Sequence, residues 1–329
     1  MTPVNIQRAR KSCFDLLIKQ VDFICQPQII SALRVIFEVI WTWSTINFEI
    51  VKAIIRWFVP PEPKDVSDDI VLITGAGHGM GREMALRFAR LGANVVCVDI
   101  NPNGNEDTVK MITEENGKAH KYECDVTDRA AVFKLAEKVH KDVGDVTILV
   151  NNAGIMPCKP LLRHSEKDIR SEVDININGN LWMLQAFLPA MLERNYGHIV
   201  AMSSMAGKMG LRNLVPYCGT KYAVRGIMES LAIELYEDPR PTDGIKFTTV
   251  CPYIVDTGLC HKPNIRFSSL MKVVSPADAA DQILDAVRRN YVEITIPSDL
   301  YYTNKVSVFF LTCITPAGRR PLLNIRPPP

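Results

Sequence analysis

The chain has 329 residues, of which 47% are apolar and 22% charged, so it is long enough for one large α/β domain with an appendage and too apolar to be largely disordered. Its 38 basic and 36 acidic residues leave a formal net charge of +2 without any basic run, which argues against nucleic-acid binding. The nine cysteines are scattered without C-x-x-C pairs or zinc-like spacing, which predicts reduced thiols in a cytosol-facing protein and no metal site.

The first 63 residues predict a segment that associates with a membrane. Residues 29–57 contain no glycine or proline and carry five charges, at Arg34, Glu38, Glu49, Lys52 and Arg56. At ~100° per residue these charges fall within an arc of roughly 60°, which makes one narrow polar stripe on an otherwise apolar helix. The longest uncharged run is far shorter than the ~20 residues that a spanning helix needs. We therefore expect a helix lying in the membrane interface; the alternative is a helix that packs on the protein's own surface or on a second subunit.

A glycine-rich loop follows the first predicted strand. A proline-rich stretch at 60–63 ends the helix, and residues 70–73 form an apolar, β-branched run that is typical of a strand buried on both faces. That run continues into residues 74–82, TGAGHGMGR, and then into helical apolar spacing over 83–91. Glycines here permit a tight turn and let the backbone approach a pyrophosphate closely. The free N–H groups of the first helical turn would donate hydrogen bonds to the negatively charged pyrophosphate. This order predicts a dinucleotide-binding unit.

The second predicted strand, residues 94–98, ends at Asp99. An acidic side chain at this place accepts both hydrogen bonds from an adenosine ribose and repels a 2′-phosphate. Neither Ile100 nor Asn101 supplies the cation that NADP would need. We therefore expect NAD as the cofactor, with NADP as the weaker alternative.

Strands and helices alternate along the rest of the domain. Further strands are expected near residues 119–124, 147–150, 198–202, 246–251 and 292–296, and helices near residues 128–143, 166–195, 216–237 and 276–290. Such alternation predicts an α/β fold with a single Rossmann-type, doubly wound parallel sheet of about seven strands over residues 64–300. The membrane-associating segment at 1–63 would precede this domain, and an apolar segment and tail at 301–329 would follow it. The carboxyl ends of the strands are expected to line the cleft.

Candidate catalytic residues follow the fourth and fifth of these strands. Residues 151–154 (NNAG) close the fourth strand, and Ser204 follows the fifth. Tyr217 and Lys221 stand four positions apart, on one face of the helix that comes next. An ammonium beside the phenol would lower the phenol's pKa from near 10 and let it exchange a proton near neutral pH.

Together these motifs resemble the short-chain dehydrogenase/reductase family over most of the predicted domain. The resemblance implies that Tyr217 is the general acid and base, that Lys221 binds the nicotinamide ribose and tunes the tyrosine, and that Ser204 orients the substrate oxygen. It also implies that Asn176 is the fourth catalytic residue, which would hold a proton-relay water next to the lysine. Asn178 is the weaker candidate for that role.

The same resemblance implies a set of cofactor contacts. These residues are Gly75, Gly79, Met80, Gly81, Asp99, Asp125, Val126, Asn152, Tyr217, Lys221, Val255 and Thr257. One departure from the family stands out, because Pro252 is followed by Tyr253 where the family usually has glycine. The larger side chain could change the local loop and intrude on the substrate mouth, whereas the preserved Thr257 favours cofactor binding.

The predicted substrate is a lipophilic alcohol or carbonyl. Residues 258–271 would form a lid that mixes apolar side chains with His261, Lys262 and Arg266. A membrane-surface helix with an apolar lid resembles the membrane-associated retinol dehydrogenases and 17-beta-hydroxysteroid dehydrogenases of the endoplasmic reticulum and lipid droplets. This resemblance implies a retinoid, steroid or fatty alcohol as substrate and a catalytic domain that faces the cytosol. The apolar stretch at 301–314 would be either a second membrane contact or a core or subunit-interface helix.

Two other functions stay open. A non-catalytic dinucleotide-binding scaffold on lipid droplets or the endoplasmic reticulum membrane would keep the fold without the reaction, but it would not need the tuned phenol of Tyr217. A fatty-acyl ketoreductase would favour NADP and a soluble tetramer, and both Asp99 and the first helix argue against it. The chain could also form a homodimer, since its sequence does not determine the oligomeric state.

Overall fold

The computed structural model describes residues 27–259, 264–265, 273–298 and 323–324 of the chain. The chain divides into two compact units, residues 1–61 and 62–329. Most of the predicted substrate lid lies outside the described residues, and the apolar stretch at 301–314 lies entirely outside them.

The first unit contains one long helix, α2 (Pro27–Phe58), which confirms the helix that the sequence predicts. Arg34 and Glu38 form an ion pair at 3.0 Å, one turn apart along it. Large apolar side chains are open to solvent, and Trp41 and Trp43 are 62% and 70% exposed. Within the described residues, none of the helices combines the length and hydropathy that crossing a membrane requires. The membrane role of α2 stays a prediction.

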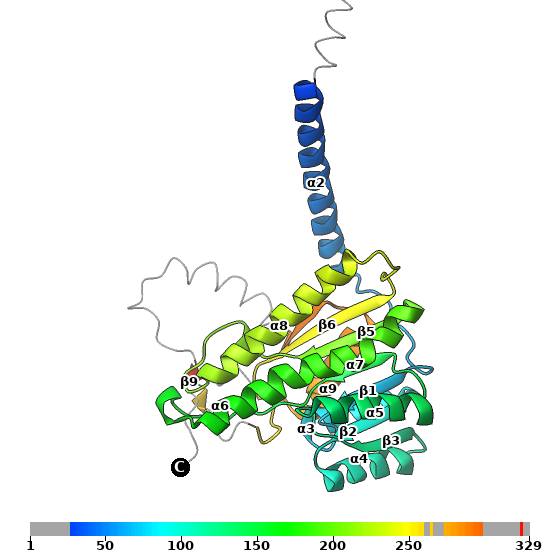
Figure 1. Ribbon diagram of the computed structural model, residues 1–329, viewed down its shortest axis with the longest axis vertical. Coiled ribbons are helices and arrows are strands. Elements are labelled where there is room, and N and C mark those ends of the chain that lie inside the picture. Colours follow the sequence, from blue (N-terminus) through cyan, green and yellow to red (C-terminus); the bar gives the residue numbers. More distant parts are fainter. Residues whose placement is uncertain (1–26, 260–263, 266–272, 299–322, 325–329) are drawn as a thin grey trace, which may run out of the picture. The chain divides into compact units, whose positions relative to one another are not determined.

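The second unit is built on one sheet of seven parallel strands (Figure 1). The strands are β1 (Ile70–Thr74), β2 (Asn94–Asp99), β3 (Lys118–Glu123), β4 (Ile148–Asn151), β5 (Gly197–Met202), β6 (Ile245–Pro252) and β8 (Glu293–Ile296). Their order is β3-β2-β1-β4-β5-β6-β8, and each pair of neighbours is parallel. The direction of winding reverses between β1 and β4, which is where doubly wound folds bind nucleotides. The predicted seven-stranded Rossmann-type sheet is therefore confirmed.

Helices cover both faces of this sheet. One face carries α3 (Gly79–Arg90), α4 (Pro102–Glu114) and α9 (Pro276–Arg288), and the other carries α5 (Arg129–Asp142), α7 (Gly179–Arg194) and α8 (Val215–Tyr236). Phe88 and Ile283 are buried on the first face, and Met183 and Val224 on the second. A short antiparallel pair, β7 (Asn264–Ile265) and β9 (Leu323–Asn324), lies outside the main sheet.

Helix α4 is absent from the sequence-based prediction. It buries only one apolar side chain, Ile112, together with Asn105 and Thr108, so its apolar stripe is too weak to stand out. Its start is set instead by Asn101, whose side chain accepts the first free N–H groups of the helix.

The long helix predicted over 166–195 is interrupted. The structure has α6 (Glu166–Val173), then a π-helical turn, η2 (Asp174–Asn178), and then α7. A π-turn inserts extra backbone into a helix and is frequent at functional sites, because it redirects the side chains that follow. This turn carries Asn176.

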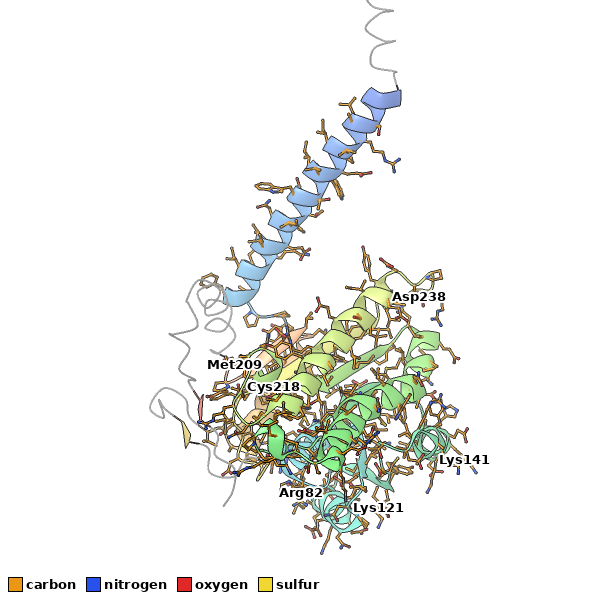
Figure 2. All side chains as sticks on the ribbon, turned by 60° about the vertical axis from the view of Figure 1, so that its left-hand side comes forward. Arg82, Lys121, Lys141, Met209, Cys218 and Asp238 are labelled. Carbon is orange, nitrogen blue, oxygen red and sulfur yellow. The ribbon has the colours of Figure 1, made fainter. Side chains whose placement is uncertain are left out.

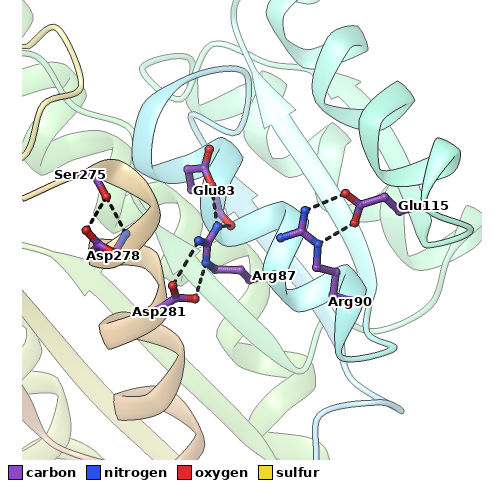
Figure 3. A network of polar contacts seen from close by, with 7 residues as sticks. All are labelled: Glu83, Arg87, Arg90, Glu115, Ser275, Asp278 and Asp281. Atoms are coloured by element: carbon purple, nitrogen blue, oxygen red, sulfur yellow. Dashed lines mark hydrogen bonds and ion pairs between the residues drawn. The ribbon is translucent and has the colours of Figure 1, made fainter.

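Ion pairs hold α3 against its neighbours (Figure 3). Arg87 of α3 bonds to Glu83 in its own helix and to Asp281 of α9, both at 2.5 Å. Arg90 makes two bonds, of 2.6 and 2.7 Å, to Glu115 at the end of α4. Helix α3 begins at the glycine-rich loop. These contacts therefore help to fix the position of the helix that follows that loop.

Candidate active site

The loop between β1 and α3 forms the predicted glycine cradle. Gly75 and Gly79 have φ of +68° and +55°, a region that residues with a Cβ rarely adopt. A Cβ on Gly81 would lie 2.0 Å from the carbonyl oxygen of Gly75, so only glycine lets α3 begin this close to the loop. The turn leaves the N–H groups at the start of α3 available to a pyrophosphate. The residues present therefore fit a dinucleotide.

Hydrogen bonds join this loop to the end of β4. The Thr74 hydroxyl accepts the N–H groups of Asn152 and Ala153, each at 3.0 Å. The side-chain amide of Asn152 donates to the Thr74 carbonyl at 2.8 Å. These hydrogen bonds join the two loops, and Asn152 reaches the cradle from the end of the neighbouring strand β4.

The carboxylate of Asp99 is fixed at the edge of the cradle. One oxygen accepts the N–H of Gly77 and the other accepts the N–H of Asn101, each at 2.8 Å. The guanidinium of Arg82 donates to the carbonyl oxygens of Gly77 and Gly104, at 2.5 and 3.2 Å, and to the Thr108 hydroxyl at 3.1 Å. Sequence reasoning missed Arg82, because its acceptors lie in two separate segments, the loop after β1 and helix α4. The hydrogen bonds of Arg82 are thus made to the protein itself.

A cavity of about 580 Å³ opens over the cradle, within the range of roughly 300–1,000 Å³ typical of ligand sites. Nine of the predicted cofactor residues line it: Gly75, Gly79, Met80, Gly81, Asp99, Asp125, Val126, Asn152 and Thr257. A smaller cavity of about 100 Å³ shares Met80, Asn152 and Thr257 with it. The other three predicted cofactor residues, Tyr217, Lys221 and Val255, line the smaller cavity.

Tyr217 and Lys221 lie one turn apart on α8, and both are buried. The Lys221 ammonium lies 5.6 Å from the centroid of the Tyr217 ring and donates to the carbonyl oxygen of Met202 at 2.7 Å. Burial lowers the pKa of Lys221 to about 8. The structure places the ammonium beside the phenol, where the predicted effect on the phenol's pKa would act.

Asn176 is fully buried in the π-turn η2. Its side-chain oxygen accepts the N–H of Ile155 at 2.9 Å, and its amide donates to the Ile155 carbonyl at 3.0 Å. The amide also donates to the Thr220 hydroxyl, at 3.1 Å, on α8. These bonds tie η2 to the loop after β4 and to the helix of the tyrosine and lysine.

Gly154 separates Asn176 from Lys221. A Cβ added to Gly154 would lie 3.2 Å from the Asn176 oxygen and 3.5 Å from the Lys221 ammonium, so both groups face the same small gap. Asn178 instead donates to Asp174 on its own turn, at 2.9 Å. Of the two asparagines that the sequence offers, Asn176 is the one that borders the site.

Ser204 lines the smaller cavity just before the 3₁₀ turn η3 (Met205–Gly207). Its hydroxyl donates to the carbonyl oxygen of Pro252 at 3.3 Å. The preceding Ser203 donates to the backbone carbonyl of Lys221 at 2.8 Å, which joins this turn to α8. The structure therefore places Ser204, Tyr217 and Lys221 in the lining of one cavity.

An ion cluster outside the cavity also holds the Ser204 turn. Glu293 of β8 pairs with Lys208 at 2.6 Å and with Arg225 at 3.0 Å. Arg225, on α8, also donates to the carbonyl oxygen of Gly207 at 3.1 Å. Sequence reasoning missed these residues, because the members of each pair stand 85 and 68 positions apart in the chain.

A glycine cradle beside a fixed carboxylate, with a buried tyrosine and lysine in the adjoining cavity, defines a nicotinamide-dinucleotide-dependent oxidoreductase. The family model described as short chain dehydrogenase matches residues 69–265. The chain belongs to the short-chain dehydrogenase/reductase family and is an NAD(P)-dependent alcohol dehydrogenase of that family.

Several curated proteins are similar over most of the chain. Epidermal retinol dehydrogenase 2 of Homo sapiens is 40% identical over 256 residues, which cover 78% of this chain and 82% of that protein. The 17-beta-hydroxysteroid dehydrogenase 13 of Homo sapiens is 36% identical over 266 residues, covering 81% and 87%. Retinol dehydrogenase 10-B of Xenopus laevis is 36% identical over 294 residues, covering 81% and 84%. The predicted likeness to retinol and steroid dehydrogenases is confirmed.

Solved structures share the fold. A short chain dehydrogenase/reductase of Burkholderia phymatum in complex with NAD has a TM-score of 0.66 at 24% identity, covering 76% of this chain and 96% of that one. A metagenomic short-chain oxidoreductase in complex with NADP has a TM-score of 0.59 at 25% identity, covering 69% and 96%. The first of these neighbours was solved with NAD and the second with NADP.

Proposed function

We propose that this enzyme uses NAD to interconvert an alcohol and a carbonyl group on a lipophilic substrate, with Tyr217 as general acid and base. The observation that carries the proposal is the smaller cavity, where Ser204 and Tyr217 share the lining with apolar side chains such as Met156 and Leu214. A retinoid, a steroid or a fatty alcohol fits such a lining, and the names of the similar retinol and hydroxysteroid dehydrogenases support the same class.

The protein's own residues would handle the proton. In the oxidation direction Tyr217 takes the proton of the alcohol hydroxyl, and in the reduction direction it returns that proton to the carbonyl oxygen. Ser204 orients this oxygen, and Lys221 keeps a positive charge beside the phenol. The gap between Asn176 and Lys221 suits a water that passes the proton onward. The glycine cradle and Asp99 would hold NAD in the larger cavity, where its nicotinamide would accept the hydride from the carbinol carbon.

The preference for NAD rests on Asp99. Its carboxylate lines the larger cavity, and a 2′-phosphate placed there would meet a like charge. Arg82, the cation that shares Gly77 with this carboxylate, is already bonded to backbone carbonyls. It is therefore badly placed to hold a phosphate.

We also propose that α2 binds the enzyme to the cytosolic surface of the endoplasmic reticulum membrane or of a lipid droplet. The exposed indoles of Trp41 and Trp43, on a helix with few charges, support this proposal.

An NADH-fluorescence screen of the full chain in detergent, against retinol, estradiol and long-chain alcohols, tests the reaction. We expect turnover of at least one of these substrates, and Tyr217→Phe should lower kcat by about 100-fold or more, because general acid–base catalysis typically contributes that much. The affinity for NADH should change less than threefold. Equal rates for the two proteins would remove Tyr217 from the mechanism, and NADH binding without any turnover would favour the scaffold.

A further inference from the structure

Large apolar side chains stand exposed on the segment that leads from β4 into α6. The 3₁₀ turn η1 (Leu161–Arg163) presents Leu162, which is 98% exposed, and Leu161, which is 46% exposed. Helix α6, which follows, adds Ile169 and Val173, one helical turn apart and each 37% exposed. A single exposed leucine is ordinary on a protein surface, but several large apolar side chains in one short segment indicate an interaction surface.

The η1 turn holds its leucines outward in a fixed conformation. Its backbone bonds run from the Arg163 N–H to the Pro160 carbonyl, at 2.8 Å, and from the His164 N–H to the Leu161 carbonyl, at 3.1 Å. The ring nitrogen Nε2 of His164 also lies 3.0 Å from the carbonyl oxygen of Lys159. A turn that is already ordered loses little conformational entropy when it binds a partner.

Two cations flank the leucines without a partner of their own. Arg163 and Lys167 are exposed, and neither forms an ion pair with any residue that the structure describes. The nearby acids are already neutralised, because Asp168 pairs with Lys159 at 2.6 Å and the carboxylate of residue 166 pairs with the guanidinium of residue 170 at 2.6 Å. The η1 turn therefore carries a local positive charge beside its apolar tip.

The chain that leads into η1 forms part of the wall of the substrate cavity. Met156 lines the smaller cavity together with Tyr217, and Cys158 packs against the cluster of buried side chains to which Tyr217 belongs. The backbone N–H of Lys159 then donates to the Asn213 carbonyl, at 3.0 Å, just before α8 begins. The exposed leucines thus lie a few residues along the chain from the wall of the candidate active site.

A phospholipid surface suits this turn better than a protein partner does. A stable protein interface buries roughly 800 Å² on each side and excludes charged residues from its centre. In η1, by contrast, Arg163 directly follows the most exposed leucine. At a membrane surface the same arrangement is favourable, because leucines enter the boundary of the acyl chains while cations stay among anionic headgroups.

We propose that the η1 turn inserts into the surface of a membrane that contains anionic phospholipid, and so orients the catalytic domain on that membrane. Leu161 and Leu162 enter the bilayer surface, and Arg163 and Lys167 contact the lipid phosphates. Two leucines and two cations are too few to hold the protein alone, since stable anchoring takes a second signal, which α2 supplies. The inference goes beyond the reaction and adds a contact made by the domain itself to the anchoring proposed for α2.

A tryptophan placed at the tip of η1 tests whether this turn meets lipid. The full chain is bound to vesicles of phosphatidylcholine and phosphatidylserine, with or without bromine on the acyl chains, because brominated chains quench an indole that they touch. In Leu162→Trp the added emission should fall at least twofold on bromination. Lys141→Trp is the control, since Lys141 is exposed on α5 across the domain from Cys218 (Figure 2), and its added emission should not change.

The role of the two cations is tested in the Leu162→Trp chain. Replacing phosphatidylserine by phosphatidylcholine should reduce the quenching, and so should Arg163→Gln or Lys167→Gln. We expect each of these substitutions to lower the ratio of inserted to free turn about fivefold, because one basic residue near an anionic surface changes such an equilibrium by about this factor. Lys141→Gln removes one positive charge elsewhere and should leave the ratio unchanged. NADH affinity reports whether each variant is folded, and Leu161→Trp replaces Leu162→Trp if that variant does not fold.

The native indoles separate failure of this inference from failure of the anchoring by α2. Quenching of Trp41 and Trp43 without quenching at position 162 overturns the inference alone, whereas the absence of both also overturns the membrane role of α2. An indole at 162 that is shielded from acrylamide in water but not quenched by lipid shows that protein covers the turn, which overturns the inference as well. Equal quenching with and without phosphatidylserine overturns the part assigned to Arg163 and Lys167.

Discussion

Lys221 brings a positive charge into a fully buried position, where its pKa falls from 10.5 to about 8. Below pH 8 the ammonium is charged in both the folded and unfolded chain, and the folded chain bears the desolvation penalty. Between about pH 8 and 10.5 the unfolded chain binds more protons than the folded one, so the free energy of unfolding rises with pH in that window. Lys221→Met should therefore stabilise the apo-protein at pH 7 by on the order of 1–3 kcal/mol while lowering turnover. Melting temperatures at pH 7 and pH 9.5 check this, and a gap between the two proteins that does not narrow at the higher pH contradicts it.

Asp99 should decide between the two cofactors mainly through its charge. Asp99→Asn has nearly the same shape and removes the repulsion of a 2′-phosphate, although its amide can accept only one of the two N–H groups that the carboxylate accepts. The ratio of kcat/KM for NADP to that for NAD should therefore rise about tenfold or more. Asp107→Asn makes the same change of net charge at an exposed position of α4 outside both cavities, and it should leave the ratio unchanged. If the two variants behave alike, Asp99 does not select the cofactor.

At the scale of elements, the site depends on how the η3 turn is held against α8. Glu293 joins Lys208 next to the turn and Arg225 on the helix, so Glu293→Gln removes the carboxylate that both cations share. We expect this variant to lose about 1–3 kcal/mol of stability, since the pairs are partly buried. Its kcat should fall more than its KM rises, because Ser204 loses its position relative to the tyrosine. Asp238→Asn is the control, since Asp238 and its partner Arg240 lie past the far end of α8, away from the η3 turn (Figure 2).

At the scale of the whole molecule, the two units should be separable. The start of the second unit is anchored by Lys64, whose backbone N–H donates to the Arg288 carbonyl at 2.8 Å, and by the buried Val66. Deletion of residues 1–60 leaves these contacts intact, so the domain should stay folded and bind NADH. The deleted protein should move from the membrane fraction to the soluble fraction after low-salt lysis. Full-length protein in the soluble fraction, or truncated protein still on membranes, would contradict the role of α2.

Much of the fold could be predicted because its signals are local. The apolar run of β1, the glycines at 75, 79 and 81 and the acid at 99 follow one another along the chain, so their order alone predicts a dinucleotide site. Tyr217 and Lys221 are one helical turn apart, and a regular helix places them together in any tertiary context. Helix α4 was not predicted, because it is marked by the capping residue Asn101 and has no clear apolar stripe.

The sequence by itself determined the Rossmann-type sheet, the glycine cradle and the pairing of tyrosine with lysine, because each follows from spacing within one or two neighbouring elements. Only the tertiary structure decided that Asn176 lies in a π-turn bonded to Ile155 and Thr220, since a π-turn alters the helical phase that a sequence pattern assumes. It alone also placed Arg82 and Glu293. Their roles depend on contacts between segments far apart in the chain, and a local pattern in the sequence cannot predict such contacts.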